Sequence, residues 1–173
     1  MTSEADLVNR TKAGDKHAFE LLYLQCVDHV YALCVRGVAN ISLAEELTQV
    51  AFIRAWETIQ SFRSESTFST WLHRITINVL LAHHRSEQRR IGKVEAGGED
   101  AFEYVSSTSF NPESIDLEKA IASLPTKARL VLILHDIEGY QHDDIAAMLE
   151  VTIGTSKSQL HRAHNLLKEW LQE

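Results

Sequence analysis

The chain has 173 residues, 45% of them hydrophobic, and a formal net charge of −7 at pH 7. Two prolines and seven glycines are too few for a fibrous or disordered chain, and the hydrophobic content suffices for one globular core or two small ones. No apolar run approaches the roughly 20 residues that span a membrane. The N-terminus carries acids and lacks the apolar segment of a signal peptide, so we expect a cytoplasmic protein without direct membrane insertion.

Apolar residues recur every three or four positions through the first half of the chain, which is typical of amphipathic helices. This spacing predicts helices over residues 4–14 and 18–38. Ser42, with Glu45 three positions later, forms the capping-box pattern. The pattern predicts that a third helix begins there and reaches residue 60.

The two cysteines, Cys26 and Cys34, fall in the second predicted helix. Two helical turns separate them by roughly 12 Å, which is too far for a disulfide within the helix. We expect small buried side chains at both positions, with a redox or metal role as the lesser alternative.

A polar corner over residues 62–67 separates the third predicted helix from a fourth over residues 68–89. Aromatic and basic side chains gather around it: Trp56, Phe62, Phe68 and Trp71, with Arg63, Arg74, Arg85, Arg89 and Arg90. In complexes with single-stranded nucleic acid, bases stack on such rings at roughly 1–3 kcal/mol per base, while cations contact phosphates. The alternative is that the rings are core anchors of a helix bundle, and composition alone favours this alternative.

The negative charge is concentrated in one segment. Residues 94–118 contain seven acidic residues and no lysine or arginine, so they account for the whole net charge. Residues 62–93, in contrast, carry six basic and two acidic residues. Because local sign governs binding more than the total does, the net charge does not exclude a nucleic-acid partner.

Residues 92–114 combine a Gly-Gly pair, a Ser/Thr cluster and an Asn-Pro pair with no sustained periodicity. This composition predicts a flexible acidic linker between two small helical domains, residues 1–91 and 115–173. We find no strand-like alternation of any length, so the predicted fold class is all-α. In the second domain the spacing predicts helices over residues 115–123 and 127–137, with Thr126 as the cap of the latter.

Residues 142–170 have the layout of a helix-turn-helix: a short helix over residues 142–149, a turn over 150–152 and a longer helix that Thr152 can cap. The buried face of the long helix is expected to comprise Ile153, Ser156, Leu160, Ala163 and Leu167. Its opposite side carries polar residues suited to base edges and phosphates, namely Thr155, Lys157, Ser158, Gln159, His161, Arg162 and Asn165. A plain helical hairpin with a solvated polar face is an equally good interpretation of this half alone. Five nearby acids weaken the DNA-binding one unless they face away from the DNA: Asp136, Glu138, Asp143, Asp144 and Glu150.

Taken together and in order, the two halves resemble the extracytoplasmic-function (ECF) group of the bacterial sigma-70 family. In the first half the resemblance rests on AFELLY (18–23), AEELTQVAFIRAW (44–56) and FRSESTFSTWLHRITIN (62–78). In the second half it rests on LPTKARLVLILHDIEGY (124–140) and DDIAAMLEVTIGTSKSQLHRA (143–163). Each motif alone is weak, but five of them in family order and spacing form a strong signal.

The resemblance implies a transcription initiation factor that gives core RNA polymerase a promoter and helps to melt it. Residues 1–91 would be sigma region 2, and the residues that dock on the clamp helices of the β′ subunit would be Glu46, Leu47, Gln49, Ile53 and Trp56. Recognition and melting of the −10 element would fall to Arg63, Phe68, Ser69, Thr70, Trp71, Arg74, Asn78 and Arg85, with a flipped base in a pocket at the corner. Arg89 and Arg90 would hold phosphates.

Residues 115–173 would be region 4, which binds the β flap and reads the −35 element. The implied readers are Thr155, Lys157, Ser158, Gln159, His161 and Arg162. No cofactor or metal is implied. Members of this group are usually held inactive by an anti-sigma factor, often a membrane-bound one. We therefore expect such a partner, and a membrane-bound one would hold the cytoplasmic protein at the membrane.

The chain departs from the usual family pattern at several positions. Glu150 and Ser64 stand where glycine is common, and Glu150 either carries a backbone penalty or belongs to a different turn. Ser156 stands where a valine usually packs, so the second helix is expected to dock less firmly. Gln159 and His164 stand where arginine is frequent, which lowers the positive charge of the −35 reader. His83, His84, His161 and His164 could restore positive charge below about pH 6.5.

Two other functions compete with this interpretation. A stand-alone helix-turn-helix regulator would explain the second half but leave the corner and residues 44–56 unused. A metal hydrolase built on His73, His83 and His84 is disfavoured, because no HExxH, paired CxxC or glycine-rich phosphate loop is present. We therefore expect no enzyme.

Overall fold

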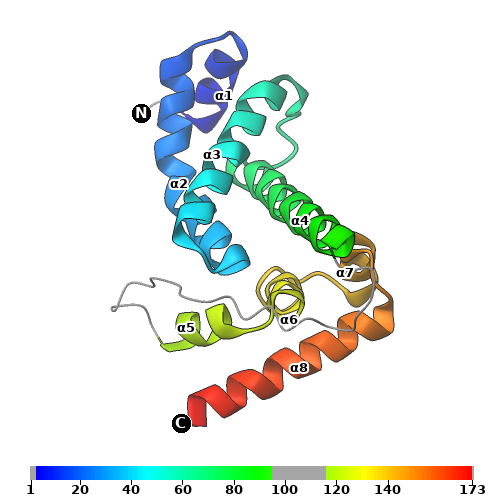
Figure 1. Ribbon diagram of the computed structural model, residues 1–173. Helices are drawn as coiled ribbons and strands as arrows, with labels where there is room; N and C mark the ends of the chain where they lie inside the picture. The colour runs from blue at the N-terminus through cyan, green and yellow to red at the C-terminus, as the bar shows by residue number, and fades with distance from the viewer. Residues whose placement is uncertain (1–2, 95–115, 173) are drawn as a thin grey trace. The chain divides into compact units, whose positions relative to one another are not determined.

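The computed structural model describes residues 3–94 and 116–172 (Figure 1). These residues form helices and turns and no strand, which confirms the all-α prediction. The helices are α1 (Glu4–Lys12), α2 (Lys16–Val38), α3 (Ile41–Thr58), α4 (Phe68–Val94), α5 (Asp116–Ser123), α6 (Thr126–Leu132), α7 (His142–Leu149) and α8 (Ile153–Gln172). A 3-10 turn, Ile59–Ser61, follows α3, and a π-helical segment, Ile133–Ile137, continues α6. Residues 95–114 of the predicted linker lie outside the described residues.

The described residues form two compact units. The first unit comprises residues 3–35 and 42–80, and the second comprises residues 36–41, 81–94 and 116–172. α4 contributes its first half to the first unit and its second half to the second.

Three predicted boundaries are wrong. α3 begins at Ile41, so Ser42 lies in its first turn and is not the cap. The reason is the buried Ala39, whose φ of 51° reverses the chain within two residues and leaves Asn40 directly before the helix. Likewise Thr126 is the first residue of α6, because Pro125 at φ −53° and ψ 141° occupies the capping position. α4 continues to Val94, past the predicted end at residue 89.

α2 and α3 supply much of the core of the first unit. Cys26 and Cys34 are both buried and free, as predicted. Burial raises the pKa of each thiol, so both cysteines behave as small apolar side chains. By length and mean hydropathy α2 could also cross a membrane. The core helix of a soluble protein can have the same length and hydropathy, and Leu22 and Leu33 of α2 lie in the core.

α1 anchors the corner, residues 62–67, at both of its ends. The Lys12 ammonium donates a 2.6 Å hydrogen bond to the Phe62 carbonyl and lies 5.9 Å from the centre of the Phe62 ring. At the other end the Glu4 carboxylate accepts the backbone N–H of Phe68 at 2.9 Å. This contact satisfies one of the free donors at the start of α4 and places a negative charge at the positive end of the helix.

In the second unit α8 packs against α5, α6 and α7. Arg129 of α6 is 1% exposed, and its guanidinium donates hydrogen bonds to the carbonyls of Ala122 and Leu124, each at 3.1 Å. These carbonyls lie at the C-terminal end of α5, where a cation also interacts favourably with the helix dipole. Arg129 therefore ties α5 to α6 from inside the unit.

The helix-turn-helix forms as predicted. α7 buries Ile145, Ala146 and Leu149, and the Thr152 hydroxyl accepts the N–H of Thr155 at 3.0 Å, which caps α8. Glu150 adopts the left-handed conformation at φ 57° and ψ 42°, so this departure from glycine carries the backbone penalty. One expectation for α8 is wrong: Ile153 is 47% exposed, because the buried face begins at Ser156.

Replacing Arg129 with methionine is expected to lower the free energy of unfolding by about 2–3 kcal/mol, because the carbonyls of Gly37, Ala122 and Leu124 lose a charged donor. The measurement is urea denaturation followed by circular dichroism. Arg89→Met, which removes an exposed guanidinium from α4, is the matched control. A loss no larger than that of the control would contradict the role assigned to Arg129.

Glu150→Gly is expected to raise the free energy of unfolding by about 1 kcal/mol, because glycine adopts the left-handed conformation without a Cβ penalty. Glu150→Ala removes the same carboxylate but keeps the Cβ, so it should give no such gain. Thermal unfolding of the two variants against the parent distinguishes the backbone effect from a charge effect. Equal stabilities of the two variants would refute the backbone explanation.

Candidate functional site

The predicted polymerase-binding residues of α3 divide into exposed and buried ones. Glu46, Gln49 and Ile53 are exposed and share one side of the helix at spacings of three and four; we call these three residues the docking face. Ile53 is 56% exposed although it is a large apolar side chain. Leu47 is only 6% exposed and lies in the core, so it supports the helix from behind. Trp56 is half-buried, and its ring packs edge-on against Phe19 at 5.1 Å.

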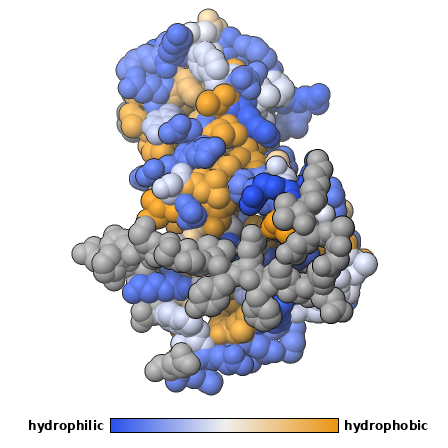
Figure 2. Space-filling model, viewed as in Figure 1, coloured by the Kyte–Doolittle hydropathy of each residue, from blue (hydrophilic) through white to orange (hydrophobic). Residues whose placement is uncertain are grey.

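Other exposed apolar side chains lie on the neighbouring helix of the first unit. Tyr23 and Leu24 of α2 are 37% and 61% exposed, and the Tyr23 ring lies 4.5 Å from that of Phe52 on α3. Figure 2 shows apolar surface gathered over the region of α2 and α3. An apolar surface with polar residues beside it is typical of a protein-binding site.

The rings at the corner form an aromatic cluster of Phe62, Phe68 and Trp71. Their centroids lie 5.1–6.2 Å apart. Phe62 and Phe68 are buried, at 4% and 0% exposure, so for these two the core-anchor interpretation is correct. Trp71 is half-buried, and it is the ring of this cluster that solvent reaches.

Trp71, Arg74 and Asn78 follow one another at spacings of three and four along α4, and both Arg74 and Asn78 are exposed. Arg63 is exposed in the corner itself, next to Ser64, which adopts φ 57°. The structure thus brings an accessible indole, a cation and an amide onto one helix face. Such a face suits the bases and phosphates of an unpaired strand.

Arg85 does not belong to this exposed face. It lies in the second unit, where its guanidinium donates a 3.1 Å hydrogen bond to the Met148 carbonyl and lies 3.7 Å from the Glu150 carboxylate. Nearby, burial lowers the pKa of His84 to about 4, and the charges of Lys127 and His83 add to the effect. The expectation that His84 gains charge below pH 6.5 is therefore wrong.

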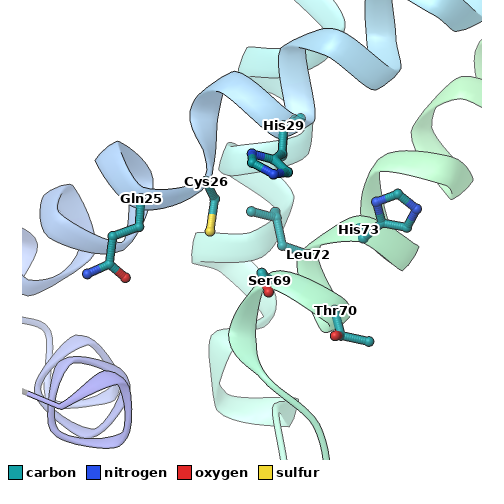
Figure 3. Close-up of a pocket in the computed structure, with 8 residues that line it drawn as sticks. Gln25, Cys26, His29, Ser69, Thr70, Leu72 and His73 are labelled. Carbon is teal, nitrogen blue, oxygen red and sulfur yellow. The ribbon is translucent and has the colours of Figure 1, made fainter.

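A cavity of about 350 Å³ opens in the first unit between α2 and the first turns of α4. Figure 3 shows Ser69, Thr70 and His73 of α4 near one another, with His29 of α2 across from them. The polar lining consists of Gln25, His29, Ser69, Thr70 and His73, and the apolar lining of Cys26, Val30 and Leu72. Sequence reasoning placed Ser69 and Thr70 in a site but missed the α2 residues, because only the packing of α2 against α4 brings them there.

The predicted −35 readers lie on α8 with unequal exposure. Lys157, Ser158 and His161 are exposed, whereas Thr155 and Arg162 are half-buried. The amide of Asn165 donates a 3.0 Å hydrogen bond to Nε2 of His161. Gln159 differs from the prediction, because its side-chain carbonyl is buried and has no hydrogen-bond partner among the described residues.

The structure also assembles a polar cluster that the sequence did not indicate. We call it the histidine–aspartate cluster, and it consists of His135, Asp136, His142, Ser156 and His164. His135 Nδ1 and His164 Nε2 each donate to one oxygen of the Asp136 carboxylate at 2.6 Å. The His135 ring stacks on that of His142 at 4.6 Å, and His142 Nδ1 lies 2.9 Å from the Ser156 hydroxyl.

Two groups of this cluster have shifted pKa values, Asp136 and His142. Partial burial by itself raises the pKa of Asp136, but the hydrogen bonds from His164 and His135 outweigh it and hold that pKa below its ordinary value. Burial lowers the pKa of His142, and His135 and Lys157 act in the same direction. Asp136 is thus an anion at neutral pH, and His142 is neutral. Within the described part of the chain, no group of three or more His, Cys, Asp or Glu side chains is arranged to hold a metal ion.

Comparison with known proteins gives two family matches. Residues 22–90 match sigma-70 region 2, and residues 114–166 match sigma-70, region 4. The chain is similar to the RNA polymerase sigma-H factor of Pseudomonas aeruginosa, at 33% identity over 99% of this chain and 96% of that protein. It is also similar to the ECF RNA polymerase sigma-E factor of Escherichia coli, at 30% identity over 96% of this chain and 93% of the relative.

Solved structures of sigma factors are also similar to this chain. The chain is similar to the sigma factor RpoE of Bartonella quintana, crystallised with the anti-sigma factor NepR, with 26% identity and a TM-score of 0.54. That match covers 89% of this chain and 96% of RpoE. CnrH, solved with the cytosolic domain of CnrY, is 20% identical with a TM-score of 0.51 over 98% of this chain and 97% of CnrH, and supports the fold alone. The chain belongs to the extracytoplasmic-function group of the sigma-70 family of RNA polymerase sigma factors.

Proposed function

We propose that this sigma factor uses three separate surfaces: the docking face of α3 for core polymerase, the exposed face of α4 for the −10 element, and the polar side of α8 for the −35 element. The observation that carries the proposal is that both family matches fall on the helices whose exposed residues suit these roles. The predicted division into region 2 (residues 1–91), an acidic linker (92–114) and region 4 (115–173) is part of the same proposal.

The docking face suits a protein partner better than DNA. An exposed isoleucine beside an amide and a carboxylate offers apolar burial with flanking hydrogen bonds, as protein interfaces do. The carboxylate of Glu46 would repel phosphates. We propose that this face meets the β′ clamp helices, that Trp56 and Leu47 hold α3 in place for it, and that region 4 contacts the β flap.

The double substitution Gln49→Ala with Ile53→Ala is expected to weaken binding to bacterial core polymerase about tenfold or more, as loss of a central apolar anchor does. The measurement is competition with a labelled sigma factor for core polymerase. Gln88→Ala with Ile91→Ala, an amide and an isoleucine on α4, is the matched control and should leave the affinity unchanged. Unchanged affinity of the Gln49 and Ile53 variant would show that the docking face is wrongly assigned.

The −10 role rests on Trp71, Arg74, Asn78 and the cavity between α2 and α4. We propose that Trp71 stacks on a base of the melted strand, Arg63 and Arg74 meet its phosphates, and the cavity that Ser69 and Thr70 line receives a flipped base. Phe68 and Phe62 keep Trp71 in position. Because Arg85 is bonded to the Met148 carbonyl, its proposed phosphate contact requires that this bond open.

Trp71→Ala is expected to reduce open-complex formation by roughly 1–3 kcal/mol, the contribution of one stacked base, and to leave closed-complex formation nearly unchanged. Permanganate reactivity of unpaired thymines reports opening, and band shift on intact duplex reports closed binding. Trp71→Phe keeps an aromatic ring at this position, so it serves as the folding control and should retain most of the opening. Equal losses in both assays would place Trp71 outside the melting step.

We propose that an anti-sigma factor regulates this protein, because a similar sigma factor binds one. RpoE of Bartonella quintana was solved with an anti-sigma factor bound. We propose that an anti-sigma factor likewise covers the exposed apolar residues of α2 and α3, Tyr23, Leu24 and Ile53, and so blocks polymerase binding. The protein would act in the cytoplasm and be retained at the membrane only if that partner is membrane-bound.

A further inference from the structure

The first residue of α8, Ile153, is a large apolar side chain that is exposed at the edge of the proposed DNA-reading side of the helix. Its exposed fraction is 47%, whereas the buried face of α8 begins three residues later at Ser156. Lys157 and His161 follow Ile153 at successive spacings of four, and both are exposed. Because residues four apart are neighbours on a helix surface, Ile153 begins the stripe that Lys157 and His161 continue.

The backbone around Ile153 is held by hydrogen bonds to the residue before it. The Thr152 hydroxyl accepts the N–H of Thr155 at 3.0 Å, and the Thr152 carbonyl accepts the N–H of Ser156 at 3.0 Å. Isoleucine is branched at Cβ and has one strongly preferred χ1 rotamer in a helix. Ile153 therefore presents its methyl groups in a defined position before any ligand binds, which lowers the entropic cost of a contact.

Gly154, the neighbour of Ile153, leaves open space at the same end of α8. It is exposed, and among the described residues a Cβ added to it would meet only the Thr152 hydroxyl, at 3.8 Å, which is an ordinary contact. Its φ lies outside the left-handed region, so the backbone does not require glycine either. Glycine is less favourable than alanine in a helix, but it allows another molecule to approach the backbone closely.

The surroundings of Ile153 suit duplex DNA better than a protein. Its exposed neighbours include Gly154 and the cationic Lys157, whereas a protein-binding site is typically an apolar patch of several side chains. In the major groove thymine alone presents a methyl group, and apolar side chains contact it. The first residues of a recognition helix are also those that reach base edges. An exposed isoleucine at the start of α8 therefore fits a thymine.

We propose that Ile153 contacts the C5 methyl group of a thymine in the major groove of the −35 element. Gly154 lets the duplex come close enough for this contact, and Lys157, one turn further along α8, meets the adjoining base edge or phosphate. Ile153 thereby makes the protein prefer thymine at one position through burial of a methyl group, without a hydrogen bond. This inference rests on the proposed role of α8 in reading the −35 element.

The experiment measures the affinity of holoenzyme, formed from the full chain and bacterial core polymerase, for an upstream duplex. The duplex is selected by the holoenzyme from a random pool and cut so that it retains only the upstream element. Each thymine of either strand is then replaced in turn by uracil, which keeps the base pairing and removes the C5 methyl group. At one position this replacement is expected to lower the affinity of the parent chain about three- to fivefold, the effect of one unburied methyl group.

Ile153→Ser is expected to bind the thymine and uracil duplexes equally at that position, because the variant has no apolar group for the methyl to contact. Ile153→Val keeps a branched apolar side chain and should retain most of the difference. Ile137→Ser, which changes a 46% exposed isoleucine of the same unit outside α8, is the matched control and should discriminate as the parent does. Retention of every uracil effect by Ile153→Ser, or a parent chain insensitive to uracil at all positions, would overturn the proposal. Selection of an upstream element that contains no thymine would overturn it as well.

Gly154→Ala tests the close approach by two separate measurements. The midpoint of thermal unfolding should not fall, because alanine is the better helix former and the added Cβ meets only an ordinary contact. The affinity for the upstream duplex should fall about fivefold or more, because the added Cβ meets the DNA at a tightly packed interface. Unchanged affinity would overturn the close approach on which the Ile153 contact depends.

The outcomes distinguish this inference from the proposed function. Holoenzyme that binds the upstream duplex no better than random DNA would refute the −35 role of α8, and the Ile153 contact with it. Sequence-dependent binding in which Ile153→Ser keeps the uracil effects of the parent would leave the −35 role intact and refute the Ile153 contact alone.

Discussion

The geometry of the proposed promoter-melting surface depends on the two contacts that α1 makes with the corner. Glu4 accepts the first free N–H of α4, and Lys12 holds the carbonyl and lies near the ring of Phe62. Both contacts are charge-assisted, and such hydrogen bonds are stronger than neutral ones. They set where α4 starts, and through the helical repeat they set the direction in which Trp71, Arg74 and Asn78 point. The buried rings of Phe62 and Phe68 then support Trp71 from the core side.

In the second unit, polar contacts of buried side chains hold the helices in place. Ser156 of α8 is fully buried, and its hydroxyl is hydrogen-bonded to His142 of α7 at 2.9 Å. A hydrogen bond fixes direction more strictly than an apolar contact does, so this bond helps to orient α8 on α7. Arg129 stabilises the same unit from inside by bonding the C-terminal carbonyls of α5.

Local sequence signals predicted the elements that local chemistry determines. The cap at Thr152, the end of the preceding segment at Gly139 with its φ of 77°, and the buried residues of α7 all follow from side chains near in sequence. The capping box at Ser42 failed, because the buried Ala39 bends the chain one step earlier than the pattern requires. Composition likewise could not tell which of the corner rings were core residues, since the full burial of Phe68 and the half-burial of Trp71 depend on tertiary packing.

The parts of the site that the sequence could not predict are those made by residues far apart in the chain. Nothing near Gln25 or His29 indicates that α2 lines a cavity with Ser69, because that depends on how α2 packs against α4. The same holds for Asp136, which sequence reasoning counted as an obstacle to DNA binding. In the structure its carboxylate accepts hydrogen bonds from His135 and His164, and His164 lies 28 positions further along the chain.

Run-off transcription tests most directly whether this protein directs core polymerase to promoters. The protein would be mixed with bacterial core polymerase and a pool of random promoter fragments, and the transcribed templates would be sequenced. The account predicts transcripts whose templates share one upstream and one downstream element at fixed spacing, and none without the protein. Failure to associate with core polymerase, together with tight binding of duplex DNA by the protein alone, would contradict it.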